Sequence, residues 1–260
     1  EEGFVLLNAL IKSLGGNVQH LFFVVTTINI LLITCVLPKY TKYPVVALMC
    51  YYGILYFNLE MIYIRQATAV ALCFFAIQFI KSKKIVWYML IIVLACTFHR
   101  VAALMIPLYF VLDRQFSVWL HLAIVGVGAI VMIIGIPWIQ SIFVTVAGWL
   151  GENYADKAQM YTENALFAVN RGFSIGFLLN LGIFIIRMFF KQKIDALPFG
   201  TIMLNMFTLS LMLYYYCFEL VEVSNRVRLF FLISIIVLLP MVLELWSLFL
   251  ERLIGLVVIT

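Results

Sequence analysis

The sequence predicts an all-α polytopic integral membrane protein, and three observations lead to this fold class. Of the 260 residues, 66% are hydrophobic and 11% are charged, whereas soluble domains carry about 25% charged residues. The mean hydropathy is +1.14, and apolar runs long enough to cross a ~30 Å hydrocarbon layer recur along the whole chain. These runs do not alternate polar and apolar residues as the strands of a membrane barrel do.

No polar stretch is long enough to fold by itself, so we expect residues 1–260 to form a single transmembrane domain. The expected architecture has about nine or ten transmembrane helices, including short hairpin helices, and an outward-facing cavity. Residues 1–16 place apolar side chains at helical spacing and end on a glycine pair, which predicts an interfacial or re-entrant amphipathic helix. The spanning runs that follow are residues 19–37, 45–59, 67–80, 85–112, 119–136, 173–190, 199–218, 229–245 and 253–260.

The run 85–112 is unusual because it contains His99 and Arg100. An arginine at the centre of a membrane helix costs about 2.5–3.5 kcal/mol on insertion scales. Two helical arms of roughly 14 residues, about 21 Å each at 1.5 Å per residue, would instead place the pair at a turn. Such a turn lies below the outer surface only where protein surrounds it or where it lines water. We therefore favour a hairpin with its turn at the bottom of a cleft, and one kinked helix is the alternative.

The distribution of basic residues predicts the orientation. If the turn at residues 38–44 is cytoplasmic and the run 85–112 crosses twice, nearly all lysines fall inside, as the positive-inside rule expects. Residues 138–171 then form an extracytoplasmic loop, and the outer cations are mostly arginines. The kinked-helix alternative would move Lys191 and Lys193 outside. The net charge of +5 thus reflects membrane orientation, and no nucleic acid is expected as a partner.

Polar residues of the outward turns form the candidate site. Arginine binds phosphate bidentately and stays charged, so an arginine-rich outer face suits a pyrophosphate. Carboxylates and a histidine suit hydroxyl binding and general-base chemistry. The candidates on the outer face are Glu1, Glu60, Tyr63, Arg65, Gln66, His99, Arg100, Arg171, Glu222, Asn225, Arg226 and Arg228.

Each candidate also has a structural interpretation. A single arginine at a membrane boundary is often a snorkelling anchor. Glu60 with Arg65, or Glu222 with Arg226, would also serve as ion pairs that hold two turns together, and His99 as a structural histidine. The cluster holds a single histidine without metal-ligand spacing and no phosphate-binding glycine loop, so neither a metal nor a cofactor is expected.

Four segments in order resemble the EpsG family of Wzy-type polysaccharide polymerases: "EEGFVLLNALIKSLGG", "IRQATAVAL", "FHRVAALMIPL" and "NRVRLFFLISIIVLLP". The family pattern has a Glu-x-Gly-aromatic opening, an Arg-Gln-x-x-Ala turn, a Phe-His-x-Ser-Ala turn and a late arginine followed by aromatics and a proline. The matching residues are Glu1, Gly3, Phe4, Arg65, Gln66, Ala69, Phe98, His99, Ala102, Arg226, Phe230 and Pro240. Val101 departs from it, because a small hydroxyl residue is usual there.

The resemblance implies a glycosyltransferase of the bacterial inner membrane whose active site faces the periplasm or outside. Undecaprenyl-pyrophosphate-linked oligosaccharide would be both donor and acceptor, as in O-antigen, capsule or exopolysaccharide synthesis. It implies that Glu1, His99 and Arg65 are catalytic, with Glu1 or His99 as the base. The remaining candidates would bind substrate, and the arginines among them would hold the pyrophosphate.

The resemblance further implies that a first helix precedes Glu1, and that membrane lipid, a flippase and a chain-length regulator are partners. Two other functions stay open. One is a transporter or flippase of lipid-linked oligosaccharide, although transporters place polar groups near the bilayer midplane. The other is a different lipid-carrier transferase, such as an O-antigen ligase.

Overall fold

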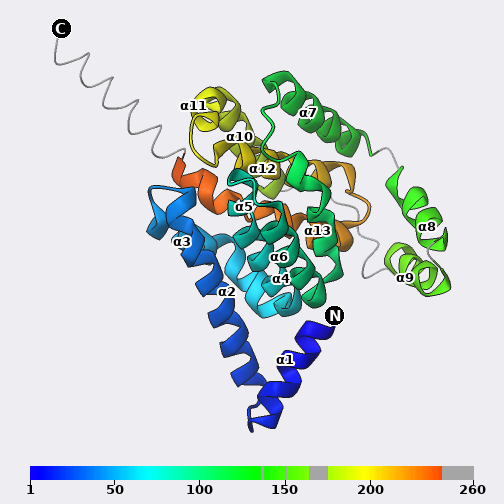
Figure 1. The fold of residues 1–260 in the computed structure, drawn as a ribbon. Coiled ribbons are helices and arrows are strands. Elements are labelled where there is room, and N and C mark those ends of the chain that lie inside the picture. The colour runs from blue at the N-terminus through cyan, green and yellow to red at the C-terminus, as the bar shows by residue number, and fades with distance from the viewer. Residues whose placement is uncertain (136–137, 150, 164–174, 242–260) are drawn as a thin grey trace. The chain divides into compact units, whose positions relative to one another are not determined.

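The computed structural model describes residues 1–135, 138–149, 151–163 and 175–241, and this part of the chain is helical without strands (Figure 1). The chain divides into two compact units. Unit 1 comprises Glu1–Gln115, Phe190–Asn205 and Ile233–Thr260, and unit 2 comprises Phe116–Phe189 and Met206–Leu232. The predicted all-α membrane fold is confirmed.

The helices of unit 1 carry most of the sequence motifs. In order they are α1 (Glu2–Ser13), α2 (Val18–Tyr40), α3 (Pro44–Tyr51), the π-helix η1 (Tyr52–Ile62), α4 (Ile64–Ala76), α5 (Gln78–Lys81), α6 (Ile85–Phe98), the 3₁₀-helices η2 (Arg100–Met105) and η3 (Pro107–Phe110), and α11 (Lys191–Asp195). Unit 2 contains α7 (Val118–Ile134), α8 (Ile139–Trp149), α9 (Glu152–Glu163), α10 (Ile175–Phe189) and α13 (Val221–Leu232). Helix α12 (Gly200–Tyr216) contributes to both units.

Among the described residues, three helical stretches are long and apolar enough to cross a membrane: Val18–Tyr40, Pro44–Ile62 and Ile64–Lys81. The number rises to five if two bent helix pairs in the described residues each count as one span. Shorter apolar helices cover Ile85–Phe98, Arg100–Phe110 and Leu178–Phe189. The polytopic architecture thus mixes full spans with short helices, as the hairpin prediction requires.

Helix α4 is the centre of unit 1. Almost every residue from Gln66 to Ala76 is buried, and α4 packs against both α2 and α6. Small side chains such as Ala67, Ala69 and Ala71 allow this close approach, because membrane helices associate through small residues. Helix α4 therefore fixes α2 and α6 on its two sides.

One face of α2 is buried along its whole length. Leu21, Val25, Asn29 and Ile33 follow each other at intervals of four residues, which places them on one side of an α-helix. At the far end of this face, the Tyr40 hydroxyl donates a hydrogen bond to the Phe74 carbonyl at 2.9 Å. This mostly apolar face thus contains one polar side chain in its middle, because the amide of Asn29 is fully buried.

The predicted hairpin at residues 85–112 is present, and its second arm is not an α-helix. Helix α6 ends at Phe98, and the next residue, His99, has extended backbone angles. The chain then folds back on α6, as two contacts between the arms show. The Tyr88 hydroxyl donates to the Met105 carbonyl at 2.7 Å, and the rings of Tyr88 and Tyr109 lie 5.1 Å apart. The returning arm forms two 3₁₀-helices, η2 and η3, and Pro107 starts the second, where a missing N–H costs no helical hydrogen bond.

Two further sequence expectations are refined by the structure. The predicted outer turn around Glu60 is shorter than expected, since η1 continues to Ile62 and α4 begins at Ile64. The predicted loop 138–171 contains α8 and α9 rather than irregular chain in its described part.

Candidate functional site

The Glu1 carboxylate in unit 1 contacts two residues that are distant in the sequence. Its Oε1 lies 2.8 Å from His99 Nδ1, and Arg65 Nη1 donates to its Oε2 at 3.1 Å. A carboxylate accepts hydrogen bonds, so the imidazole proton of this contact resides on Nδ1. We call these three residues the Glu1 triad. It joins the first residue of the chain to positions 64 and 98 residues further on.

Each member of the Glu1 triad lies at a helix end. Glu1 precedes α1 as its N-cap, Arg65 is the second residue of α4, and His99 follows α6. The side chains are exposed by 28%, 62% and 16%, respectively. The triad is therefore accessible, and more than half of the Arg65 side chain is exposed.

The close approach of α1 to α6 depends on Gly3. A Cβ atom at Gly3 would lie 2.5 Å from Thr97 Oγ1 and 3.3 Å from a Phe98 ring carbon. These contacts are shorter than side chains tolerate, so any larger residue would push α1 away from α6. Gly3 thus allows Glu1 to reach His99 without strain.

The other side of α1 is fixed on α2 by a small apolar core. Ile11, Leu21 and Val25 form its buried centre. The partly buried side chains packed around it are Phe4, Leu7, Val24 and Ile64. Because Ile64 directly precedes Arg65, one cluster fixes the positions of both Glu1 and Arg65.

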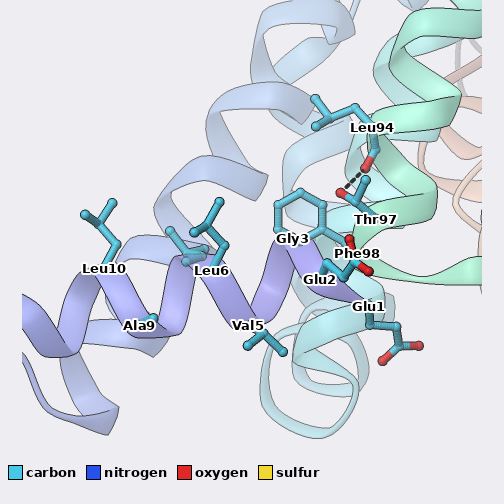
Figure 2. Close-up of a pocket in the computed structure, with 11 residues that line it drawn as sticks. Glu1, Glu2, Gly3, Val5, Leu6, Ala9, Leu10, Leu94, Thr97 and Phe98 are labelled. Atoms are coloured by element: carbon cyan, nitrogen blue, oxygen red, sulfur yellow. Dashed lines mark hydrogen bonds between the residues drawn. The ribbon is translucent and has the colours of Figure 1, made fainter.

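An open apolar groove of about 980 Å³ borders the Glu1 triad between α1 and the end of α6. Figure 2 shows Glu1, Glu2 and Thr97 near one end of the groove, with Leu6 and Leu10 further along α1. The other lining residues are Gly3, Val5, Leu7, Ala9, Leu94 and Phe98. A long hydrocarbon chain fits such a groove, because the polar residues of the groove are confined to the end that holds Glu1.

Glu60 is separated from the triad by burial. Its side chain is fully buried, and it accepts hydrogen bonds from the Tyr51 hydroxyl at 2.6 Å and from Asn29 Nδ2 at 2.9 and 3.2 Å. The Thr26 hydroxyl donates to it at 3.3 Å. In the described structure, Glu60 therefore binds α2 and α3 side chains rather than forming the ion pair with Arg65 that one interpretation suggested.

The remaining unit 1 candidates lie close to Arg65 or to His99 in the sequence. Tyr63 directly follows η1 and is half-buried, whereas Gln66 is buried at the start of α4. Arg100 is exposed and begins η2, directly after His99. Tyr63 and Arg65 thus come from one helix junction, and His99 and Arg100 come from another.

The candidates of unit 2 lie on α13. Arg226 Nε donates to Glu222 Oε1 at 2.9 Å, one helical turn away, and the Arg228 guanidinium lies 4.8 Å from the centre of the Tyr214 ring. Asn225 occupies the same helix. Arg171 lies outside the described residues. Unit 2 thus presents a cationic helix, while the carboxylate–histidine contact belongs to unit 1.

Sequence reasoning assigned no individual role to three polar residues that organise these regions. Thr26 and Asn29 interrupt an apolar run, and an amide inside a membrane span signals a buried partner. Glu219 accepts backbone N–H groups of Trp138 and Gln140 at 2.7 and 3.0 Å. It therefore caps the start of α8, where helix N–H groups lack internal partners.

The fold and the site together define a polytopic helical membrane protein with an exposed carboxylate–histidine–arginine group beside an apolar groove. Residues 1–259 match the EpsG family, and the chain belongs to that family. EpsG is a Wzy-type polymerase-like family, which supports a role in polysaccharide polymerisation. Neither the curated proteins nor the solved structures gave a match.

Proposed function

We propose that this protein is a glycan polymerase that works on undecaprenyl-pyrophosphate-linked oligosaccharides. It transfers a growing oligosaccharide from its lipid carrier to the terminal sugar hydroxyl of another lipid-linked repeat unit. The observation that carries the proposal is the Glu1 carboxylate held between His99 and Arg65. This arrangement combines a proton acceptor with an open cation, the two groups that the transfer needs.

The proposed step breaks the bond between the anomeric carbon of the donor and the pyrophosphate oxygen. The acceptor hydroxyl oxygen forms the new glycosidic bond, and its proton passes to Glu1 or to His99. The polyprenyl pyrophosphate leaves with the bonding electron pair. Arg65 stabilises the developing negative charge, because preorganised cations act most strongly where charge appears in the transition state.

Other residues are proposed to bind the substrate. Arg100, Arg226 and Arg228 supply cations for the pyrophosphate, together with Arg171. A second set of side chains binds the sugar hydroxyl groups. Its members carry amide or hydroxyl groups, which donate and accept hydrogen bonds, or a carboxylate, which accepts them. In this set we place Tyr63, Gln66, Glu222 and Asn225, whereas the buried contacts of Glu60 separate it from an incoming sugar.

We assign the apolar groove beside Glu1 to the hydrocarbon chain of the lipid carrier. Its volume of about 980 Å³ is at the upper end of the ~300–1,000 Å³ typical of ligand sites. A chain lying along Leu6 and Leu10 would leave its charged head near Glu1 and Arg65. The proposed setting is the bacterial inner membrane, with the site on the outer face and with a flippase and a chain-length regulator as partners.

A transporter of lipid-linked oligosaccharide is the second candidate, because one observation favours it. Glu60 and Asn29 form a buried polar pair inside two candidate spans, and transporters place such groups within the membrane. Product length separates the two functions, since transport leaves the length of each lipid-linked unit unchanged.

The test uses purified protein and a synthetic polyprenyl-pyrophosphate repeat unit, without metal or nucleotide sugar. Products are resolved by size for the wild type, His99→Ala and Arg65→Ala. A ladder of longer lipid-linked glycans that both variants lose supports the polymerase. A single unchanged band from the wild type with its native repeat unit overturns it and favours transport or a different acceptor.

A further inference from the structure

We propose that Glu60 is a positioning residue that holds the helix junction carrying Arg65 against α2. The sequence pattern suggested contact with substrate, but the buried contacts of Glu60 point to this different role. The inference rests on the proposed function where it concerns catalysis. Its structural part concerns the junction alone and has a test of its own.

The first observation is that Glu60 joins three helices. It lies on η1, accepts hydrogen bonds from Thr26 and Asn29 on α2, and accepts another from Tyr51 on α3. The side chains of Glu60 and Asn29 are fully buried. Burying a carboxylate or an amide this deeply costs free energy unless it is hydrogen-bonded. Arrangements that break these contacts are therefore unfavourable, and the side chains keep one arrangement.

The second observation is the π-helical form of η1. Tyr51 and Glu60 are nine residues apart, which is two and a half turns of an α-helix at 3.6 residues per turn. They would then point in opposite directions. The wider π turn, of about 4.4 residues, returns them to the same side after two turns. The Tyr51–Glu60 hydrogen bond therefore requires η1 to stay π-helical.

The third observation is that η1 ends directly at the Arg65 junction. The Tyr63 N–H donates to the Asn58 carbonyl at 3.0 Å, which closes the last π turn. The Ala67 N–H donates to the Tyr63 carbonyl at 2.8 Å, which opens α4. Tyr63 thus belongs to both hydrogen-bond patterns, so a change of register in η1 would move Arg65.

Two attachments to α2 therefore fix the junction from both sides. Glu60 binds Asn29 before the junction, and Ile64 packs against Leu21 and Val25 within it. Since the same apolar cluster holds α1, the Glu60 attachment keeps Arg65 in register with Glu1. Loss of Glu60 would leave the apolar contact in place and free the junction to rotate.

A double-mutant cycle tests the catalytic part. Glu60→Ala should lower kcat at least tenfold in the wild-type background, and should cause no further decrease in the Arg65→Ala background, because residues that act through one group are non-additive. Tyr40→Phe is the matched control, since it removes a buried hydroxyl at the other end of α2, and it should leave kcat within twofold. Equal proportional decreases in both backgrounds would overturn the inference. If Glu60→Ala does not fold, Glu60→Gln replaces it in the cycle, with an expected decrease of threefold or more.

Hydrogen exchange tests the structural part without substrate. In Glu60→Ala or Glu60→Gln, peptides covering residues 58–67 should exchange at least tenfold faster than in the wild type, whereas Tyr40→Phe should leave them unchanged. Unchanged exchange in the Glu60 variants would overturn the positioning role. This result is independent of polymer formation, so it separates failure of the inference from failure of the proposed function.

Discussion

Two carboxylate–arginine pairs of similar geometry occupy different structural settings. Glu1 and Arg65 are 3.1 Å apart and come from segments 64 residues apart, whereas Glu222 and Arg226 are 2.9 Å apart on one turn of α13. The local pair forms wherever its helix forms and stabilises it by about 0.2–0.5 kcal/mol. The long-range pair exists only when the starts of α1 and α4 meet, and the His99 contact adds the end of α6. The Glu1–Arg65 pair therefore depends on tertiary packing, whereas the Glu222–Arg226 pair depends only on local helix formation.

This comparison predicts a difference in function. The Glu1 carboxylate that holds Arg65 also contacts His99, so this pair is part of a group with a titratable imidazole. Substitutions in the Glu1 triad should therefore affect the chemical step. Substitutions in the α13 pair should affect binding alone.

The largest effect is expected for Glu1→Gln. The amide keeps the shape of the side chain but removes the negative charge that orients His99 and accepts a proton. Loss of a general base lowers rates by about 10²–10⁴, so we expect kcat for polymer formation to fall within this range. The measurement is the initial rate of chain extension by purified variants in detergent.

Glu2→Gln is the matched control for Glu1→Gln, because Glu2 lines the same groove but is outside the triad. We expect its rate to stay within threefold of the wild type. A similar decrease in both variants would indicate that general negative charge at the start of α1 matters, and that the bridging contact does not.

An intermediate effect is expected for Gly3→Ala, which separates α1 from α6 without removing a triad residue. The new Cβ would meet Thr97 Oγ1 at 2.5 Å. A displacement of about 1 Å can cost 10²-fold in rate, so we expect kcat to fall about 10- to 100-fold. The same overpacking should lower the free energy of unfolding by about 1–3 kcal/mol.

Thr97→Ala should restore much of the activity of Gly3→Ala, because it removes the oxygen that the new methyl group meets. The double variant and both single variants are compared by chain-extension rate and by thermal unfolding. If Gly3→Ala retains full activity, the close approach of α1 is not needed for the triad.

The sequence predicted the helical membrane class and the hairpin turn at His99 because both follow from local pattern and length. It also named all three triad residues as candidates, although their mutual contact is a tertiary property. Glu60 shows the limit of this reasoning. An α-helical register and a turn after residue 59 place it at the surface, whereas the π-helical register of η1 turns it toward Asn29.

Glu219 illustrates a second limit. Its residue type and its position after an apolar run favour an exposed loop acid, yet it is buried as the cap of α8, 79 to 81 residues earlier in the chain. No spacing rule connects a carboxylate with the N–H groups of a distant helix. Such contacts depend on how helices pack, which local sequence does not encode.

The smallest effect is expected for Arg226→Ala. Loss of the local pair should change the free energy of unfolding by no more than about 0.5 kcal/mol. Because we assign Arg226 to the pyrophosphate, KM should rise about tenfold, which corresponds to one charge-assisted hydrogen bond of about 1.5 kcal/mol. An unchanged kcat would indicate that this contact is equal in the ground and transition states. Arg226→Lys keeps the charge without the bidentate geometry, so its KM should lie between that of the wild type and that of Arg226→Ala. If Arg226→Ala leaves KM unchanged, Arg226 serves only as half of a helix-surface ion pair, and the chemistry depends on unit 1.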